Sequence, residues 1–363
     1  MRLMDFQEKQ FIQEILGPLA KTAALENFDD AVVIDLADLA GIRNAPFLVY
    51  SMDQPSFVRH ADASLDPFRF YGRWVAGTTC NDVIAMGGRC RGFSLALAAP
   101  LESKIDDVRS LVVGIKDVLD RCGATYEGGN LDSGDLGTVG FVWGIVSRDG
   151  IVRRSGAQPG DRIVVTGELG LGWLEYQLRK NKLTAQIAVE DKPTFLRYKL
   201  MPVGAAAAIA DIAERGWFTS GMDLSDGLVE FLYSIVLHSD LGCEVDAQKL
   251  PVPLAARRNL PLFGSIEPRA AKVLRRTPEL IALEPGYDSP LRHAFTIRPE
   301  VLPLAQEVFQ EHDGSLYDIG QVTSESAVIL RDAKTRSEIP PFWDDQLRQE
   351  SKLGAWVKFL EEF

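Results

Sequence analysis

The chain has 363 residues, of which 46% are hydrophobic and 25% charged, and its formal net charge is −12. This composition is typical of a globular protein, and the length predicts about two domains. The acidic balance argues against nucleic acid as a partner, because nucleic-acid-binding proteins present basic patches. No apolar run approaches the ~20 residues of a membrane span. The opening MRLMDFQEKQF also lacks the apolar segment of a signal peptide.

The cysteine content fits a reducing compartment. The four cysteines form no C-x-x-C pair, and only four histidines accompany them. We therefore expect reduced thiols, no zinc site and a cytoplasmic protein that contacts no membrane.

Strand and helix patterns alternate along the first half of the chain. Apolar residues at helical spacing predict an amphipathic helix over 11–19. The predicted strands are 31–36, 46–52, 93–99 and 138–146, and the predicted helices are 67–86 and 106–121. This order indicates an α/β domain over residues 1–150.

A polar connection rich in Gly and Pro, RRSGAQPGD at 153–161, separates this domain from a second alternation. The predicted elements there are a strand at 161–167, a helix at 203–215, and strands at 294–297 and 326–330. The Gly-rich GELGLG at 167–172 has the spacing G-x-x-G-x-G, which favours a strand-to-helix turn over a phosphate cradle. We expect a second α/β domain over 151–345 and a C-terminal tail over 346–363.

The segment GMDLSDGLVEFL joins an apolar strand to an apolar helix and carries Asp223, Ser225 and Asp226. Ser225 occupies a predicted N-cap position, with Asp226 in the first turn, and a helix start suits a phosphate. The two carboxylates supply the oxygen ligands that Mg²⁺ prefers beside a phosphate. The alternative is a structural one: a serine cap with an aspartate that favours the helix dipole.

Similar acidic positions recur, which weakens the structural alternative. Asp30 begins one predicted strand, Asp53 ends another, and Asp82 lies in an apolar helix where an unpaired carboxylate is costly. The sequence EGGN supplies a glycine pair, Gly128 and Gly129, that permits close approach of a ligand. Converging carboxylates require cations, and therefore indicate Mg²⁺ with a polyphosphate. Neither a P-loop nor a protein-kinase motif set is present.

In chain order, FDDAVV, SMD, NDVIAMGG, EGGN, RRSGAQPGD and MDLSDGL resemble the thiamine-monophosphate kinase family, within the superfamily of aminoimidazole ribonucleotide synthetase. The resemblance covers roughly residues 28 to 330. It implies a two-domain PurM-like fold, with an N-terminal sheet that forms a barrel across a homodimer and a C-terminal α/β domain. It also implies that ATP binds in a cleft and that Mg²⁺ ions bridge its phosphates to aspartates.

The resemblance assigns roles to particular positions. Those matching metal ligands are Asp30, Ser51, Asp53, Asp82, Asp223 and Asp226. Those matching contacts to ATP are Gly128, Gly129, Asn130, Arg154 and Ser225. His60 and Asp288 match the pocket of the acceptor substrate, although a solvated loop histidine and a surface arginine remain the alternatives for His60 and Arg154. No single catalytic base is assigned, since phosphoryl transfer depends mainly on positioning and charge neutralisation.

Two departures from the family pattern bear on function. Asn130 replaces an acidic residue, with Asp132 as a candidate substitute. The family segment GGEDYEL appears only as EPGYDSPL at 284–291, followed by Arg292 and His293, which are read either as donors to an anionic acceptor or as solvated loop residues. We expect an ATP- and Mg²⁺-dependent small-molecule kinase whose acceptor differs from thiamine monophosphate. The alternatives are an ATP-dependent synthetase that activates a carbonyl oxygen, and a nucleotide-binding protein without turnover.

Overall fold

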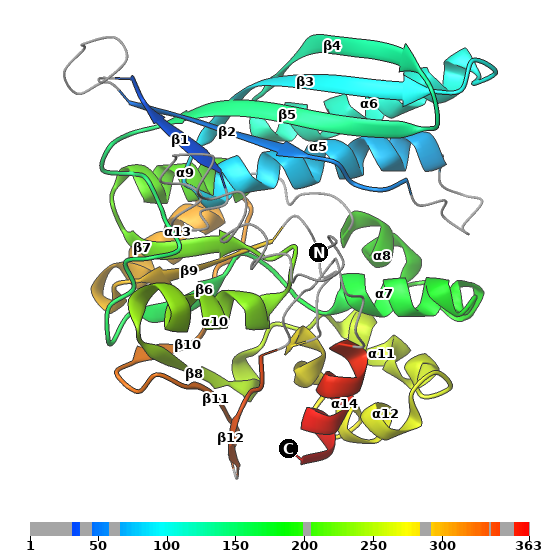
Figure 1. Cartoon of the computed structure of the whole chain (residues 1–363). Coiled ribbons are helices and arrows are strands. Elements are labelled where there is room, and N and C mark those ends of the chain that lie inside the picture. Colours follow the sequence, from blue (N-terminus) through cyan, green and yellow to red (C-terminus); the bar gives the residue numbers. More distant parts are fainter. Residues whose placement is uncertain are drawn as a thin grey trace, which may run out of the picture.

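The computed structural model describes residues 31–36, 46–57, 66–198, 205–283, 292–333, 335–341 and 352–362. In these residues the chain forms two β-sheets with helices against them, and Figure 1 shows one sheet above the other. This arrangement confirms the predicted mixed α/β class. No helix in the described ranges is long and apolar enough to cross a membrane. The helix expected at 11–19 lies outside them.

The first sheet has the strand order β1-β2-β5-β3-β4. Its strands are β1 (Val32–Asp35), β2 (Phe47–Asp53), β3 (Arg89–Ala99), β4 (Thr125–Ser133) and β5 (Gly137–Val146). Four of them match the predicted strands. β4, which contains the glycine pair, was not predicted as a strand; it pairs in parallel with β3 at one edge of the sheet.

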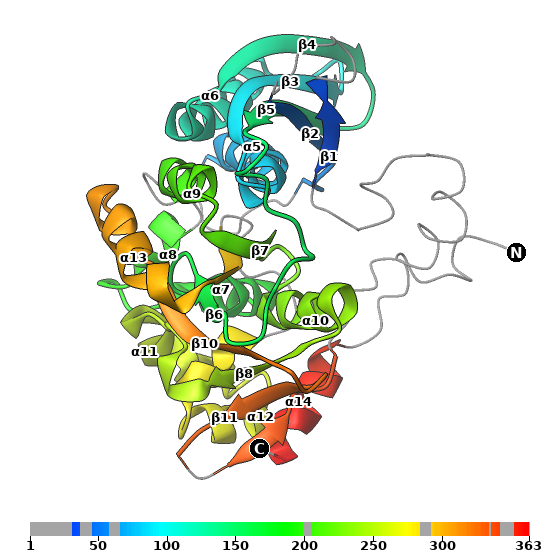
Figure 2. The same ribbon diagram turned by 90° about the vertical axis from the view of Figure 1, so that its left-hand side faces the viewer.

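Two helices, α5 (Pro67–Ala85) and α6 (Ile105–Cys122), lie against one face of this sheet (Figure 2). Their backbones come close together through two glycines. A Cβ on Gly72 would lie 1.9 Å from the carbonyl oxygen of Leu111, and one on Gly114 would lie 2.0 Å from that of Arg69. Larger residues would therefore force the two helices apart.

The second sheet has the order β12-β11-β8-β10-β6-β9-β7. Its strands are β6 (Arg162–Val165), β7 (Phe218–Asp223), β8 (Gly242–Asp246), β9 (His293–Ile297), β10 (Tyr317–Thr323), β11 (Val328–Arg331) and β12 (Arg336–Glu338). The helices in this part are α7 (Leu171–Lys180), α8 (Lys192–Tyr198), α9 (Ala205–Glu214), α10 (Leu228–Ser239), α11 (Leu254–Phe263), α12 (Pro268–Leu274) and α13 (Leu302–Glu311). The GELGLG segment forms a turn from β6 to α7, as predicted, with Gly170 as the N-cap at φ 85°.

Alternate residues of the second sheet enter two different apolar clusters, as expected for a sheet covered on both faces. Ile163 and Val165 join the cluster with α7, α10 and α11. Val164 and Phe295 join the cluster that contains α9, α13 and the core of the first domain. Arg89 adds ion pairs across this junction, 2.6 Å to Asp211 and 2.9 Å to Glu214 of α9. The two domains therefore share a core.

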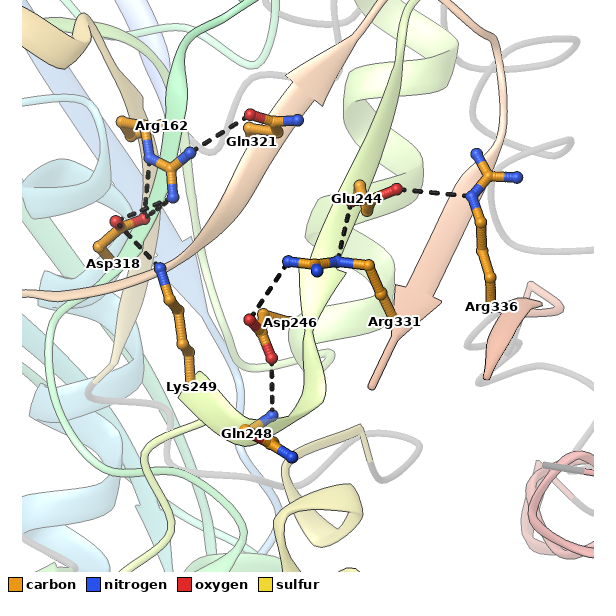
Figure 3. A network of polar contacts seen from close by, with 9 residues as sticks. All are labelled: Arg162, Glu244, Asp246, Gln248, Lys249, Asp318, Gln321, Arg331 and Arg336. Atoms are coloured by element: carbon orange, nitrogen blue, oxygen red, sulfur yellow. Dashed lines mark hydrogen bonds and ion pairs between the residues drawn. The ribbon is translucent and has the colours of Figure 1, made fainter. Parts of the chain in front are cut away.

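A network of charged side chains occupies part of the second sheet, on β6, β8, β10, β11 and β12 and on the turn that follows β8 (Figure 3). Arg162 lies 2.7 Å from Asp318, and Arg331 lies 3.1 Å from Glu244. Arg336 lies 3.5 Å from Glu244, and Lys249 lies 3.7 Å from Asp318. Exposed pairs such as these stabilise a fold only slightly.

The segment expected to be a C-terminal tail contains helix α14 (Lys352–Glu362), which packs into the second domain. Trp356 is fully buried and its ring centroid lies 5.0 Å from that of Trp173. Phe359 and Leu360 are buried in the same cluster. Helix α14 therefore contributes Trp356, Phe359 and Leu360 to the apolar core of this part of the chain.

Candidate functional site

Helix α5 connects the two domains at the site. It contacts β2, β3 and β5 of the first sheet and β7 of the second. The helix begins where Asp66 accepts hydrogen bonds from the backbone N–H groups of Phe68 and Arg69. Its final turn carries two polar residues, Asn81 and Asp82, which face groups from different domains. α5 therefore sets the relative position of the predicted ligands.

On the first-domain side, Ser51 Oγ donates a 2.5 Å hydrogen bond to Asp82 Oδ2. Asp53 lies two residues beyond Ser51 on β2, and so on the same face of the strand. Its Oδ1 accepts a hydrogen bond from the N–H of Gln54 at 2.7 Å. The structure thus brings Ser51 and Asp82 into contact, with Asp53 on the same strand face.

On the second-domain side, Asp223 ends strand β7 and is only 5% exposed. Asn81 Nδ2 donates a 2.8 Å hydrogen bond to Asp223 Oδ2. Because Asn81 and Asp82 are adjacent, the carboxylates of Asp82 and Asp223 are both held from the same turn of α5. Sequence reasoning missed Asn81, although a polar residue buried in an apolar helix was a usable signal.

The prediction that Ser225 caps α10, with Asp226 in its first turn, is wrong. The helix begins at Leu228 with Gly227 as its N-cap, and no side chain caps it. A turn closed by a 3.1 Å hydrogen bond from Gly227 N to the carbonyl oxygen of Leu224 separates it from β7. Gly227 adopts φ 93°, a conformation that glycine accepts at low cost. Ser225 is exposed and Asp226 half-buried in this turn, close to Asp223 in the chain.

The connection at 153–161 lies against β7. The N–H of Gly221 donates to the carbonyl oxygen of Arg153 at 2.9 Å. Gly156 has φ 117°, and a Cβ there would lie 2.4 Å from the carbonyl oxygen of Thr219. The half-buried Arg154 is therefore held beside the strand that ends at Asp223.

The glycine pair is not brought to these carboxylates in this chain. In the register of the sheet, Asp53 pairs with Gly140, Gly140 with Leu95, and Leu95 with Gly129. Three strand spacings separate the ends of this row, about 14 Å. Gly129 and Asn130 are exposed on the edge strand. Three other predicted site residues, Asp30, His60 and Asp288, lie outside the described residues.

Arg292 and His293 are both buried, at 6% and 1% exposure, so the reading of them as solvated loop residues is wrong. His293 is equally unable to serve as an exposed donor: its Nε2 faces the carbonyl oxygen of Asn81 at 3.3 Å. Burial lowers the pKa of His293 to about 3, so the ring is neutral at pH 7.

Arg292 Nε donates to the carbonyl oxygen of Glu168 at 3.3 Å, above Gly167. Burial raises the pKa of the Glu168 carboxyl, and the nearby Arg292 charge opposes that rise.

The donor set suits Mg²⁺, because every candidate ligand at this junction is a carboxylate or hydroxyl oxygen. No group of three or more Asp, Glu, His or Cys side chains in the described part of the chain is placed to hold a metal by itself. Mg²⁺ usually binds one or two carboxylates together with substrate phosphates and water, and needs no complete protein cage. Asp82 and Asp223 fit that mode.

Comparisons with known proteins agree with this architecture. Sequence models described as AIR synthase related protein, N-terminal domain and C-terminal domain, match residues 28–146 and 158–332. Thiamine-monophosphate kinase from Escherichia coli is 30% identical over 314 residues, which is 84% of this chain and 89% of that enzyme. The Halobacterium salinarum enzyme is 34% identical over 189 residues, 51% of this chain.

Alignments with the Halobacterium enzyme and two similar relatives span 58 to 62% of those enzymes' own length. A solved structure described as AaThiL complexed with AMPPCP and TMP superposes with a TM-score of 0.70 at 20% identity. That superposition covers 93% of this chain and 98% of the other. The likeness shows that this chain has the PurM-like two-domain fold predicted from its motifs.

Proposed function

Because the chain belongs to the AIR synthase related family, together with the thiamine-monophosphate kinases, we propose that it is an ATP- and Mg²⁺-dependent kinase that phosphorylates a small acceptor. One observation carries the proposal. Asp82 on α5 accepts a hydrogen bond from Ser51 of the first domain, and its neighbour Asn81 donates one to Asp223 of the second domain. Such a junction suits a ligand that must be oriented between two domains. The nucleotide analogue AMPPCP named with the AaThiL structure supports ATP as the donor.

Within this proposal, Asp53, Asp82 and Asp223 hold Mg²⁺, with Asp30 and Asp226 completing the ligand set. Ser51 fixes the orientation of Asp82 through its 2.5 Å hydrogen bond. Bound Mg²⁺ neutralises the negative charge of the phosphates and favours in-line transfer of the γ-phosphoryl group. The residues of the chain supply position and charge, and no strong general base is required.

Arg154 and the start of α10 contact the phosphates in this proposal. No side chain caps α10, and the start of a helix suits an anion. Ser225, exposed in the turn before the helix, adds a hydroxyl. Arg154 provides a permanent positive charge beside β7.

The proposal includes a homodimer and a domain boundary near residue 150. β4 is an edge strand in which Leu131 is 69% exposed, and on β2 Met52 is 61% exposed. The aromatic rings of Tyr50 and Phe141 are half-buried, with centroids 5.7 Å apart, on the face away from α5 and α6. A second copy that closed the sheet into a barrel would cover these groups and bring Gly128, Gly129 and Asn130 to a site. The family matches end and resume at residues 146 and 158, which supports the boundary.

The decisive experiment screens metabolites with ATP and Mg²⁺ for a mass gain of one phosphoryl group. A kinase produces ADP in proportion to the phosphorylated acceptor. A synthetase releases phosphate and requires a second substrate, and a non-catalytic binder does neither.

Calorimetry adds a second test, since we expect ATP to bind only with Mg²⁺ present. Equal affinity without metal contradicts the proposed carboxylate site.

A further inference from the structure

We infer that Asn81 is a positioning residue, which sets the carboxylate of Asp223 relative to that of Asp82. The inference rests on the proposed Mg²⁺–ATP function, and assigns a role to a side chain outside the predicted ligand set. Asn81 is fully buried at the end of α5, and its Nδ2 lies 2.8 Å from Asp223 Oδ2. Its neighbour Asp82 accepts from Ser51.

The orientation of the Asn81 amide follows from chemistry. An ionised carboxylate can only accept hydrogen bonds, so the NH₂ group, and not the oxygen, faces Asp223. A charge-assisted bond of this kind is stronger than a neutral one. It therefore restricts the direction in which Asp223 presents its oxygens.

His293 makes a second contact to Asn81, from strand β9. It is the register partner of Asp223 in the β7–β9 pair, and its Nε2 lies 3.3 Å from the carbonyl oxygen of Asn81. A carbonyl can only accept, so Nε2 carries the ring proton. α5 is thus fastened to β7 by the side chain of Asn81 and to β9 by its backbone.

The unpaired atoms at this junction argue against a purely structural role. Asn81 Oδ1 and His293 Nδ1 are buried and have no hydrogen-bond partner among the described residues. An unsatisfied buried acceptor typically costs about 1–3 kcal/mol. A leucine at position 81 would avoid that cost but would also remove the donor to Asp223 Oδ2, so the unpaired Oδ1 does not explain the asparagine. The orientation of Asp223 does.

The first test compares Asn81→Leu with Arg89→Leu in the full-length chain. The readout is calorimetric affinity for AMPPCP with Mn²⁺, a cation whose coordination is also visible by electron paramagnetic resonance. Asn81→Leu should weaken this affinity roughly 10- to 100-fold, the usual effect of removing a group that orients a metal ligand. Arg89→Leu removes the ion pairs between the domains at Asp211 and Glu214 and leaves the site untouched. We expect it to bind within about threefold of the wild type, as a surface ion pair contributes little.

Equal affinity in the wild type and Asn81→Leu overturns the inference. So does an equal loss in Arg89→Leu, because loosening of the domain junction would then explain the effect. If the wild type itself fails to bind the metal–nucleotide pair, the proposed function has failed instead.

Asn81→Gln tests the inference without relying on the fold of Asn81→Leu. It keeps an amide donor, displaced by one methylene, and leaves the carboxylate of Asp223 in place. The free energy of unfolding in urea shows whether the variant folds, and we expect Mn²⁺–AMPPCP affinity at least about 10-fold weaker than in the wild type. Wild-type affinity in a folded Asn81→Gln variant overturns the inference, because the position of the amide would then not matter.

Discussion

The hydroxyl of Ser51 lies 2.5 Å from Asp82 Oδ2, and so ties the end of strand β2 to the final turn of helix α5. Ser51 is itself 8% exposed. A carboxylate held by a buried hydroxyl has fewer orientations to lose when it binds a cation. The contact therefore lowers the entropic cost of placing Asp82 on a metal.

Replacing Ser51 tests this relationship. We expect Ser51→Ala to lower turnover about 10- to 100-fold, because Asp82 loses the group that orients it. Ser51→Thr keeps the hydroxyl and suits a β-strand, and should retain most of the activity. Similar rates for the alanine and threonine variants would contradict the role given to the hydroxyl.

Asp226 provides a test of the metal assignment. Asp226→Asn should reduce turnover at least ~10²-fold, typical of removing an electrostatic group from a transition state. The fold should survive, since Asp226 lies in a turn and the N-cap of α10 is Gly227, not an aspartate or serine. Asp240→Asn is the matched control: it ends the same helix at φ 53°, a conformation that asparagine tolerates. A near-normal rate for Asp226→Asn refutes its assignment as a ligand.

The stability of the first domain should depend on pH through Asp117 of α6. Its hydrogen bond with Arg69, and its contact with Arg73, hold the pKa of this carboxyl below the ordinary 3.8, against an opposing effect of burial. A lowered folded-state pKa stabilises the protein above the unfolded-state value, and this contribution disappears as pH falls through the folded-state value.

We therefore expect Asp117→Asn to lower the free energy of unfolding by about 1 kcal/mol at pH 7. The difference should shrink as the pH drops below about 4. Urea titrations at several pH values measure this difference in the free energy of unfolding. Asp120→Asn is the control, because the ion pair between Asp120 and Lys116 is exposed and 3.6 Å long. A difference that persists unchanged at pH 2 would contradict the pKa argument.

The proposed dimer makes a prediction for strand β4. Light scattering should give twice the 40.0 kDa mass of the chain at micromolar concentration. Leu131→Lys places a charge on the exposed edge strand and should dissociate the dimer, whereas Val189→Lys, at a site 78% exposed in the second domain, should not. A wild-type mass that stays at one chain, with or without ATP, counts against the dimer.

The acceptor can be tested directly. We predict that thiamine monophosphate is a poor substrate, because residues 284–291 depart from the family segment that helps to form its pocket. The measurement is turnover of thiamine monophosphate beside metabolites identified by the phosphoryl screen. A kcat/KM of ~10⁴ M⁻¹s⁻¹ or above, as in ordinary enzymes, would show that these departures leave the pocket intact.

Local patterns predicted much of this fold because they report on burial within one element. The helices at 67–86 and 106–121 correspond closely to α5 and α6, whose apolar residues face the sheet. β4 escaped prediction because its residues are mostly exposed, and its glycines and polar residues resemble a loop. A strand at an edge needs little apolar surface, so its sequence carries little signal.

The carboxylates of the site could be predicted from the sequence, but the side chains that orient them could not. Asp82 and Asp223 stand out in sequence as charges in apolar surroundings. The contact between Asn81 and Asp223 depends on how two domains meet, which no local spacing encodes. The start of α10 was misplaced for a related reason: serine is a common cap, but the chain needs Gly227 to turn out of β7.

The apolar cluster shared by α5, α6, α9 and α13 has a consequence for how the chain unfolds. A cut near residue 150 would divide this cluster, with α5 and α6 on one fragment and Val164 and Phe295 on the other. Each fragment would then expose its part of this cluster, a surface prone to aggregation. The two halves should therefore melt together as one cooperative unit, although two separate family models describe them.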